Sequence, residues 1–143
     1  MRPIEQSTFL PGLLLENGKI IVDPEKLLYP GDILHEAGHL AAYAPEERKT
    51  IGDPLPEYMA DGFEMMALAW SYAACLYVGL DASVVFHNGG YKGGSDAILV
   101  AFNTGSYIGL PMLQYLGLAY DTKNSEELGI LPYPNMVHWL KPN

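Results

Sequence analysis

Two histidines and a glutamate are the residues of this chain whose spacing predicts chemistry. They are His35, Glu36 and His39, in the stretch "DILHEAGHLA". Residues four apart on an α-helix lie one turn apart on the same face, so both imidazoles can bind one metal ion. Glu36 lies about 100° round the helix, beside the position that such a site leaves open. There its carboxylate can take a proton from a metal-bound water, whose pKa the ion lowers to about 7. The pattern is therefore typical of a hydrolytic metal site.

The neighbours of the motif indicate a helix built for burial. Leu34, Ala37 and Leu40 are uncharged. Gly38 costs about 1 kcal/mol relative to alanine inside a helix, which is explained if another backbone packs closely against it. The alternative interpretation is a metal-free helix with two core histidines bonded to carbonyl groups and an exposed Glu36. The combined spacing favours the metal.

A catalytic zinc ion needs a third protein ligand besides two histidines. The stretch "LPEYMADGFEMMALAW" contains Glu57, Asp61 and Glu64, which on a helix fall within about 60° of one another. The other faces of this helix are apolar and predict burial, so its carboxylates need a partner such as a metal ion. Glu64 is the first candidate and Asp61 the second, whereas the helix dipole alone accounts for Glu57 in the first turn. The remaining carboxylates would brace His35 or His39 by hydrogen bonds.

On these residues the chain resembles the zincin metallopeptidases with an HExxH helix, and within them the gluzincin-like branch. "EMMALAW" is similar to the ligand helix of small ImmA/IrrE-type domains, which implies Glu64 as the ligand. "LPEYMADGFEMM" resembles a segment of peptidase MA-like proteins, which implies Asp61 where those proteins have Glu. Glu57-x-x-x-Asp61 also looks like the ExxxD of thermolysin-like gluzincins, whose Glu binds the metal. The resemblance covers roughly residues 10–78 and implies a small sheet, the HExxH helix and a second ligand helix.

The elements around the motif follow from local signals. Residues 13–15 and 19–22 flank Asn17-Gly18, a strong signal for an antiparallel hairpin because both turn residues tolerate positive φ. The motif helix should run from Asp32 to about Tyr43, since the residue before Pro45 disfavours helical geometry. Residues 45–56 predict a polar loop.

The second ligand helix should begin near Pro54 or Pro56, with Asp53 as N-cap, and end near Val78. After it, residues 81–86 look strand-like and pass into a glycine-rich loop. Further helices are expected from a cap at residue 95 or 96 to residue 102, and within residues 109–121. The tail, residues 128–143, is rich in proline and aromatic residues. The fold class is therefore α+β, a single mostly helical domain over residues 1–143 with a small N-terminal antiparallel sheet.

Composition excludes several function classes. The 143 residues are 49% hydrophobic and 17% charged, with a formal net charge of −9. This balance argues against nucleic acid and against an anionic membrane surface as partners. The single cysteine, Cys75, excludes a disulfide framework and a thiolate zinc site. The stretch 97–120 contains too many polar residues for a membrane span, and the N-terminus shows no signal-like apolar core. We therefore expect a cytoplasmic protein.

Two further histidines lie outside the motif. His87 lies in "FHNGGYKGGSD", where either His87 or Tyr91 could donate to the oxyanion of a tetrahedral intermediate; the alternative is an ordinary surface loop. His138 in the tail is expected to be a surface histidine.

The sequence thus predicts a zinc-dependent metallohydrolase, most simply a small metallopeptidase, whose substrate is a peptide or protein. The cofactor would be Zn²⁺, held by His35, His39 and an acid, with Glu36 as the catalytic base. Strand 19–22 could pair with an extended peptide. The alternative is a metal-binding zincin-like module without peptidase activity, because 143 residues leave little room for a second lobe to complete a substrate cleft. Such a module would act through a homodimer or a partner protein, using the apolar helices of residues 97–120.

Overall fold

The computed structural model describes residues 1–8, 10–52, 60–89 and 94–143, and from residues 60–62 the backbone alone. Within these residues the chain is mostly helical, with one two-stranded antiparallel sheet near the N-terminus. The α+β class predicted from the sequence is therefore confirmed. The elements are β1 (Leu13–Glu16), β2 (Lys19–Val22), α1 (Asp32–Ala41), α2 (Pro45–Arg48), α3 (Ala60–Val78), the 3₁₀ helix η2 (Ala82–Val84), α4 (Ser95–Asn103), α5 (Leu110–Tyr115) and α6 (Thr122–Leu128).

The predicted hairpin is present. β1 and β2 pair antiparallel, and the last pair before the turn joins Glu16 to Lys19. The two turn residues, Asn17 and Gly18, have φ angles of 50° and 73°, as a two-residue turn with right-handed strand twist requires. Residues 13–15 of β1 are buried. The hairpin packs beside α1, the helix that contains the HExxH motif.

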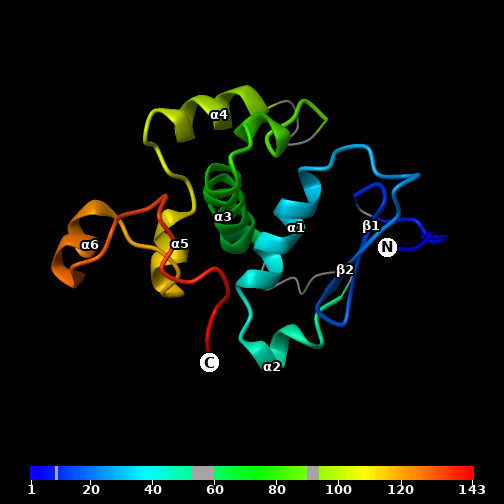
Figure 1. Ribbon diagram of the computed structural model, residues 1–143, viewed down its shortest axis with the longest axis horizontal. Coiled ribbons are helices and arrows are strands. Elements are labelled where there is room, and N and C mark those ends of the chain that lie inside the picture. The colour runs from blue at the N-terminus through cyan, green and yellow to red at the C-terminus, as the bar shows by residue number, and fades with distance from the viewer. Residues whose placement is uncertain (9, 53–59, 90–93) are drawn as a thin grey trace.

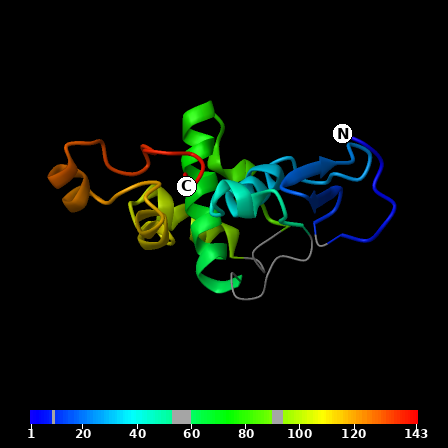
Figure 2. The same cartoon turned by 90° about the horizontal axis from the view of Figure 1, so that it is seen from below.

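Helix α3 lies at the centre of the molecule, between α1 on one side and α5 on the other (Figure 1). Seen from below, the elements spread along one long axis, with α6 at the end opposite the N-terminus (Figure 2). A Cβ added to Gly38 of α1 would lie 3.1 Å from both the Cα and the carbonyl oxygen of Ala67 in α3. The close backbone approach predicted at Gly38 is therefore confirmed, and α3 is the helix that makes it.

The main core surrounds α3. Met66, Ala69 and Cys75 are fully buried there, and α5 and the tail complete the same cluster. Burial raises the pKa of the Cys75 thiol, as expected for a cysteine inside an apolar core. The tail is fixed to α3 by Trp70, whose Nε1 donates to the carbonyl oxygen of Trp139 at 2.7 Å.

Several predicted elements were wrong in detail. Helix α1 ends at Ala41, before the predicted end at Tyr43. Part of the predicted polar loop forms α2, since Pro45 occupies the first helical turn, where its missing N–H is not needed. The strand-like start of residues 81–86 forms η2, because the Asp81 carboxylate accepts from the Ser83 N–H at 2.9 Å and caps a helical turn.

The later helices also differ from the prediction. Gly94 occupies the N-cap position of α4 without a side-chain bond, so neither Ser95 nor Asp96 caps it. Helix α6 was not predicted, although Asp121 caps it by accepting from the Asn124 N–H at 2.8 Å. The predicted start of the second ligand helix, with its cap at residue 53, lies outside the described residues. In the described part of the chain, no helix has both the length and the apolar character needed to cross a membrane.

Arg48 ties α1, α2 and the tail together. Its guanidinium donates to the carbonyl oxygens of Leu40 at 3.1 Å, Tyr43 at 2.7 Å and Lys141 at 3.0 Å. The Lys141 N–H in turn donates to the carbonyl oxygen of Ala41 at 2.9 Å. Because a helix leaves its last carbonyl groups without helical partners, this arrangement closes the C-terminal end of α1.

We therefore predict that Arg48→Gln lowers the free energy of unfolding by about 2–3 kcal/mol, since several charge-assisted hydrogen bonds are lost together. Chemical denaturation followed by circular dichroism measures this change. The matched control is Lys49→Gln, since the exposed Lys49 bonds only to Glu46 among the described side chains. It should change stability by less than about 0.5 kcal/mol. Equal losses in both variants would contradict the role of Arg48.

Candidate metal centre

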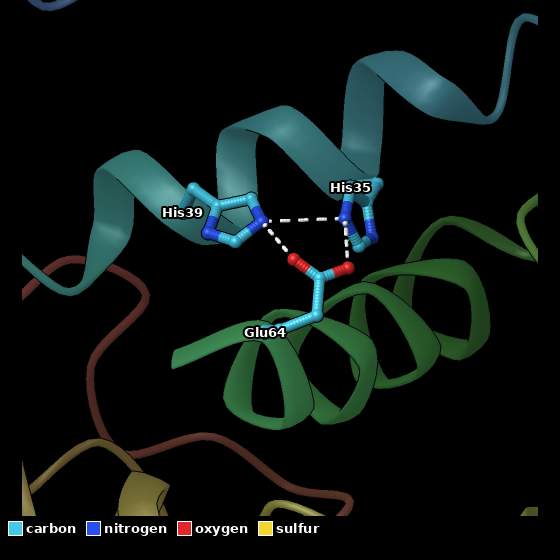
Figure 3. A group of neighbouring side chains, drawn as sticks. All are labelled: His35, His39 and Glu64. Atoms are coloured by element: carbon cyan, nitrogen blue, oxygen red, sulfur yellow. Dashed lines mark hydrogen bonds and ion pairs between the residues drawn. The ribbon is translucent and has the colours of Figure 1, made fainter. Parts of the chain in front are cut away.

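Three side chains meet between α1 and α3. His35 and His39 project from successive turns of α1, and Glu64 rises from α3 to face both rings (Figure 3). Glu64 Oε1 lies 2.9 Å from His35 Nε2, and Oε2 lies 2.8 Å from His39 Nε2. The three residues offer ligand atoms that all lie within 4.8 Å of one another, close enough to hold a metal ion.

The spacing of the two imidazoles fits a tetrahedral ion. His35 Nε2 and His39 Nε2 are 3.3 Å apart, and the rings meet edge to face at 79°. Two metal–nitrogen bonds of about 2.0–2.1 Å at the tetrahedral angle put the two nitrogens about 3.3–3.4 Å apart. The rings thus already have the separation that the ion needs.

Burial and charge differ across the site. His35 and His39 are 7% and 6% exposed, whereas 49% of the Glu64 side chain is exposed. Partial burial favours the neutral form of Glu64, but hydrogen bonds and charge interactions with the two histidines outweigh it and hold its pKa well below the usual range. Glu64 is therefore a carboxylate at neutral pH, and solvent reaches the site on its side.

The contacts of His35 and His39 indicate which of the predicted acids could be the third ligand. Glu64 is the carboxylate that approaches both histidines among the side chains that the structure describes. The Asp61 side chain and all of Glu57 lie outside those residues. Helical spacing placed these three acids on one face, but only the contact between α1 and α3 determines which of them lies opposite the imidazoles.

Glu36, the predicted base, lies next to His35 in α1. It is only 9% exposed, so the alternative of an exposed glutamate beside two core histidines does not hold. A buried carboxylate needs compensation by hydrogen bonds or charge.

His87 is held against the first turn of α1. Its Nε2 lies 2.6 Å from Asp32 Oδ1, and 12% of its side chain is exposed. Its ring stacks on Tyr29, with centroids 3.8 Å apart and planes 7° from parallel. His87 therefore does not belong to an ordinary surface loop. Asp32, the first residue of α1, therefore anchors this loop one turn before Glu36.

The pairing of Asp32 with His87 was not predicted from the sequence. Gly31 permits it in the structure: a Cβ added there would overlap the carbonyl of Val84, so the glycine allows residues 82–87 to approach α1 closely. Tyr91, the other predicted oxyanion donor, lies outside the described residues. His138 is exposed, as expected for a surface histidine.

Comparisons with models of known protein families, with curated proteins and with solved structures returned no match.

If the three side chains bind one ion, the purified protein should take up one equivalent of Zn²⁺. Substituting His35→Ala or Glu64→Ala should weaken binding by at least about 100-fold, since losing only an outer hydrogen-bond partner of a ligand costs about 10–100-fold. Competition with a chromophoric chelator measures the affinity. The control is His138→Ala, which removes an exposed histidine elsewhere and should bind as the parent protein does. Equal loss in this control would contradict the assignment.

Substitution of Asp32, the buried acid at the start of α1, tests its contact with His87. Asp32→Ala should lower the free energy of unfolding by about 3–5 kcal/mol, because it removes the buried carboxylate that His87 contacts at 2.6 Å. Thermal and chemical unfolding measure this loss. The control Asp96→Ala alters an exposed acid in the first turn of α4 and should cost less than about 1 kcal/mol. A similar cost in both variants would show that the contact with His87 contributes little.

Proposed function

We propose that this protein is a zinc-dependent metallohydrolase, most simply a metallopeptidase of the gluzincin-like kind. One observation carries the proposal: the Nε2 atoms of His35 and His39 are 3.3 Å apart and both face the carboxylate of Glu64. Two imidazoles and a carboxylate form a donor set well suited to zinc. This set, next to a buried Glu36, matches the requirements of hydrolysis better than those of a structural site, which needs no base.

The ion would supply Lewis acidity, which acidifies water and polarises a carbonyl group. The chain itself supplies the proton transfer. A Glu36 carboxylate oxygen would accept the proton of the attacking water and then pass it to the leaving nitrogen. His35 and His39 are positioned for binding on a buried helix, so little ordering remains when substrate arrives.

Access to the site supports a peptide or protein as substrate. The half-exposed side chain of Glu64 leaves one side of the centre open to solvent. β2 is half-buried over Ile20–Val22, and an edge strand can bind an extended peptide through its backbone. A cytoplasmic location is part of the proposal, in agreement with a single buried and unpaired cysteine.

The proposal is tested by Glu36→Gln. This substitution keeps the shape of the side chain but removes the base, so hydrolysis should fall by about 10²–10⁴-fold while zinc affinity stays within a few-fold of the parent. Mass spectrometry of a diverse peptide library incubated with the zinc-loaded protein measures cleavage. Glu47→Gln, an exposed glutamate of α2, is the matched control and should retain full activity.

The second candidate is a metal-binding module that acts through a partner rather than by catalysis. It is favoured by the large apolar side chains that remain exposed, such as Tyr77 and Tyr115. Tight zinc binding with no cleavage of the library by the parent protein would contradict the hydrolase and favour this candidate.

A further inference from the structure

Three residues near the end of the tail bridge the two helices that carry the candidate metal ligands. The carbonyl oxygen of Trp139 accepts from Trp70 Nε1 of α3 at 2.7 Å. Two residues later, the Lys141 N–H donates to the carbonyl oxygen of Ala41, the last residue of α1, at 2.9 Å. The end of the tail passes beside α1 and α3 in both views of the chain (Figure 1 and Figure 2). Segment 139–141 therefore connects α1 to α3 in addition to their direct contact.

Both bonds of this segment lie about one helical turn from the place where the backbones of α1 and α3 meet. That place is the contact of Gly38 with Ala67. Ala41 follows Gly38 by three residues, and Trp70 follows Ala67 by the same number, while one turn of an α-helix takes about 3.6 residues. Each helix is thus held at two points. Two points restrain rotation and sliding of one helix against the other, whereas a single contact leaves a pivot.

The direct contact between the helices consists of small residues. Gly38 has no side chain, and Ala41 and Ala67 are fully buried. Large side chains form the ridges that interlock one helix with another, so small residues allow close approach but resist sliding weakly. The bridge supplies a directional restraint at this point. Its α3 end is itself fixed, because Trp70 is 7% exposed and its ring meets that of Trp139 edge to face at 5.5 Å.

The distances among the candidate ligands divide into two kinds. His35 and His39 belong to the same helix, so helical geometry and their own rotamers determine the 3.3 Å between their Nε2 atoms. The distances from Glu64 to these atoms, 2.9 and 2.8 Å, depend on where α3 lies against α1. A binding site must hold its groups within about 0.5 Å of the productive geometry. A small shift between the helices would therefore displace Glu64 while the imidazole pair stayed intact.

We propose that segment 139–141 is a positioning element of the metal centre, which sets the distance between Glu64 and the two imidazoles through its bonds to Trp70 and Ala41. This role rests on the metal centre of the proposed function, and it adds residues outside the ligand set to that centre. The tail thereby contributes to metal affinity as well as to the stability of the fold.

Removal of the Lys141 N–H tests this role. Lys141→Pro deletes the donor, since proline has no backbone N–H, whereas the matched control Lys141→Ala keeps the donor and loses only the side chain. Competition with a chromophoric chelator should show a zinc dissociation constant raised about 10-fold in Lys141→Pro, at the lower end of the range for groups that support ligands. The constant should be unchanged in Lys141→Ala. Circular dichroism checks the fold, which a substitution so near the C-terminus should preserve.

Trp70→Phe tests the other end of the bridge, because phenylalanine keeps an aromatic ring at this position without an N–H donor. Its control is Asp121→Ala, which removes the cap of α6 and should destabilise the fold to a similar degree, since a cap and a hydrogen bond contribute similar amounts. The visible absorption of bound Co²⁺ depends on ligand geometry. It should change in Trp70→Phe and stay the same in Asp121→Ala, because a loss of stability alone does not alter the ligands of the folded protein.

The results separate this role from the proposed function. A parent protein that binds no zinc contradicts both. A parent that binds zinc, with the same affinity and the same Co²⁺ spectrum in Lys141→Pro and Trp70→Phe, contradicts the positioning role alone. Equal weakening of zinc binding in Lys141→Pro and Lys141→Ala would also overturn it, since the effect would then belong to the lysine side chain.

Discussion

The backbones of α1 and α3 approach each other closely at Gly38, beside the candidate metal centre. Gly38 precedes His39 directly, and Ala67, which it meets, follows Glu64 by one turn of α3. A Cβ at position 38 would already lie 3.1 Å from the Ala67 backbone, so only glycine allows this separation without displacement. The contact therefore lies within one turn of the ligand atoms, and it determines whether a glutamate on α3 reaches two imidazoles on α1.

The HExxH helix is held at both ends as well as along its side. At its N-terminal end, Asp32 binds His87, which stacks on Tyr29. At its C-terminal end, the guanidinium of Arg48 donates to the carbonyl oxygens of Leu40 and Tyr43. A helix fixed in this way keeps its imidazoles in one geometry, and such preorganisation would favour the metal binding that we propose.

Local patterns predicted the parts of the structure that depend on near neighbours in sequence. The spacing of His35 and His39 follows from helix geometry, the hairpin follows from Asn17-Gly18, and the need for close packing follows from Gly38. The pairing of Asp32 with His87 joins residues far apart in the chain, so no periodicity could reveal it. Likewise, Glu64 faces the two imidazoles because of the position of α3 along α1. Helical spacing within α3 does not determine that position. Residues 82–84 form a helical turn despite the strand propensity of Val84 and Val85, and the Asp81 carboxylate caps this turn.

We propose that one metal ion binds between α1 and α3, and anomalous diffraction at the zinc edge from crystals of the zinc-loaded protein tests this proposal. We expect one peak about 2.0–2.2 Å from His35 Nε2, His39 Nε2 and a carboxylate oxygen of Glu64. A peak at the Asp32–His87 pair instead, or imidazoles turned away from each other with no peak between them, would contradict it.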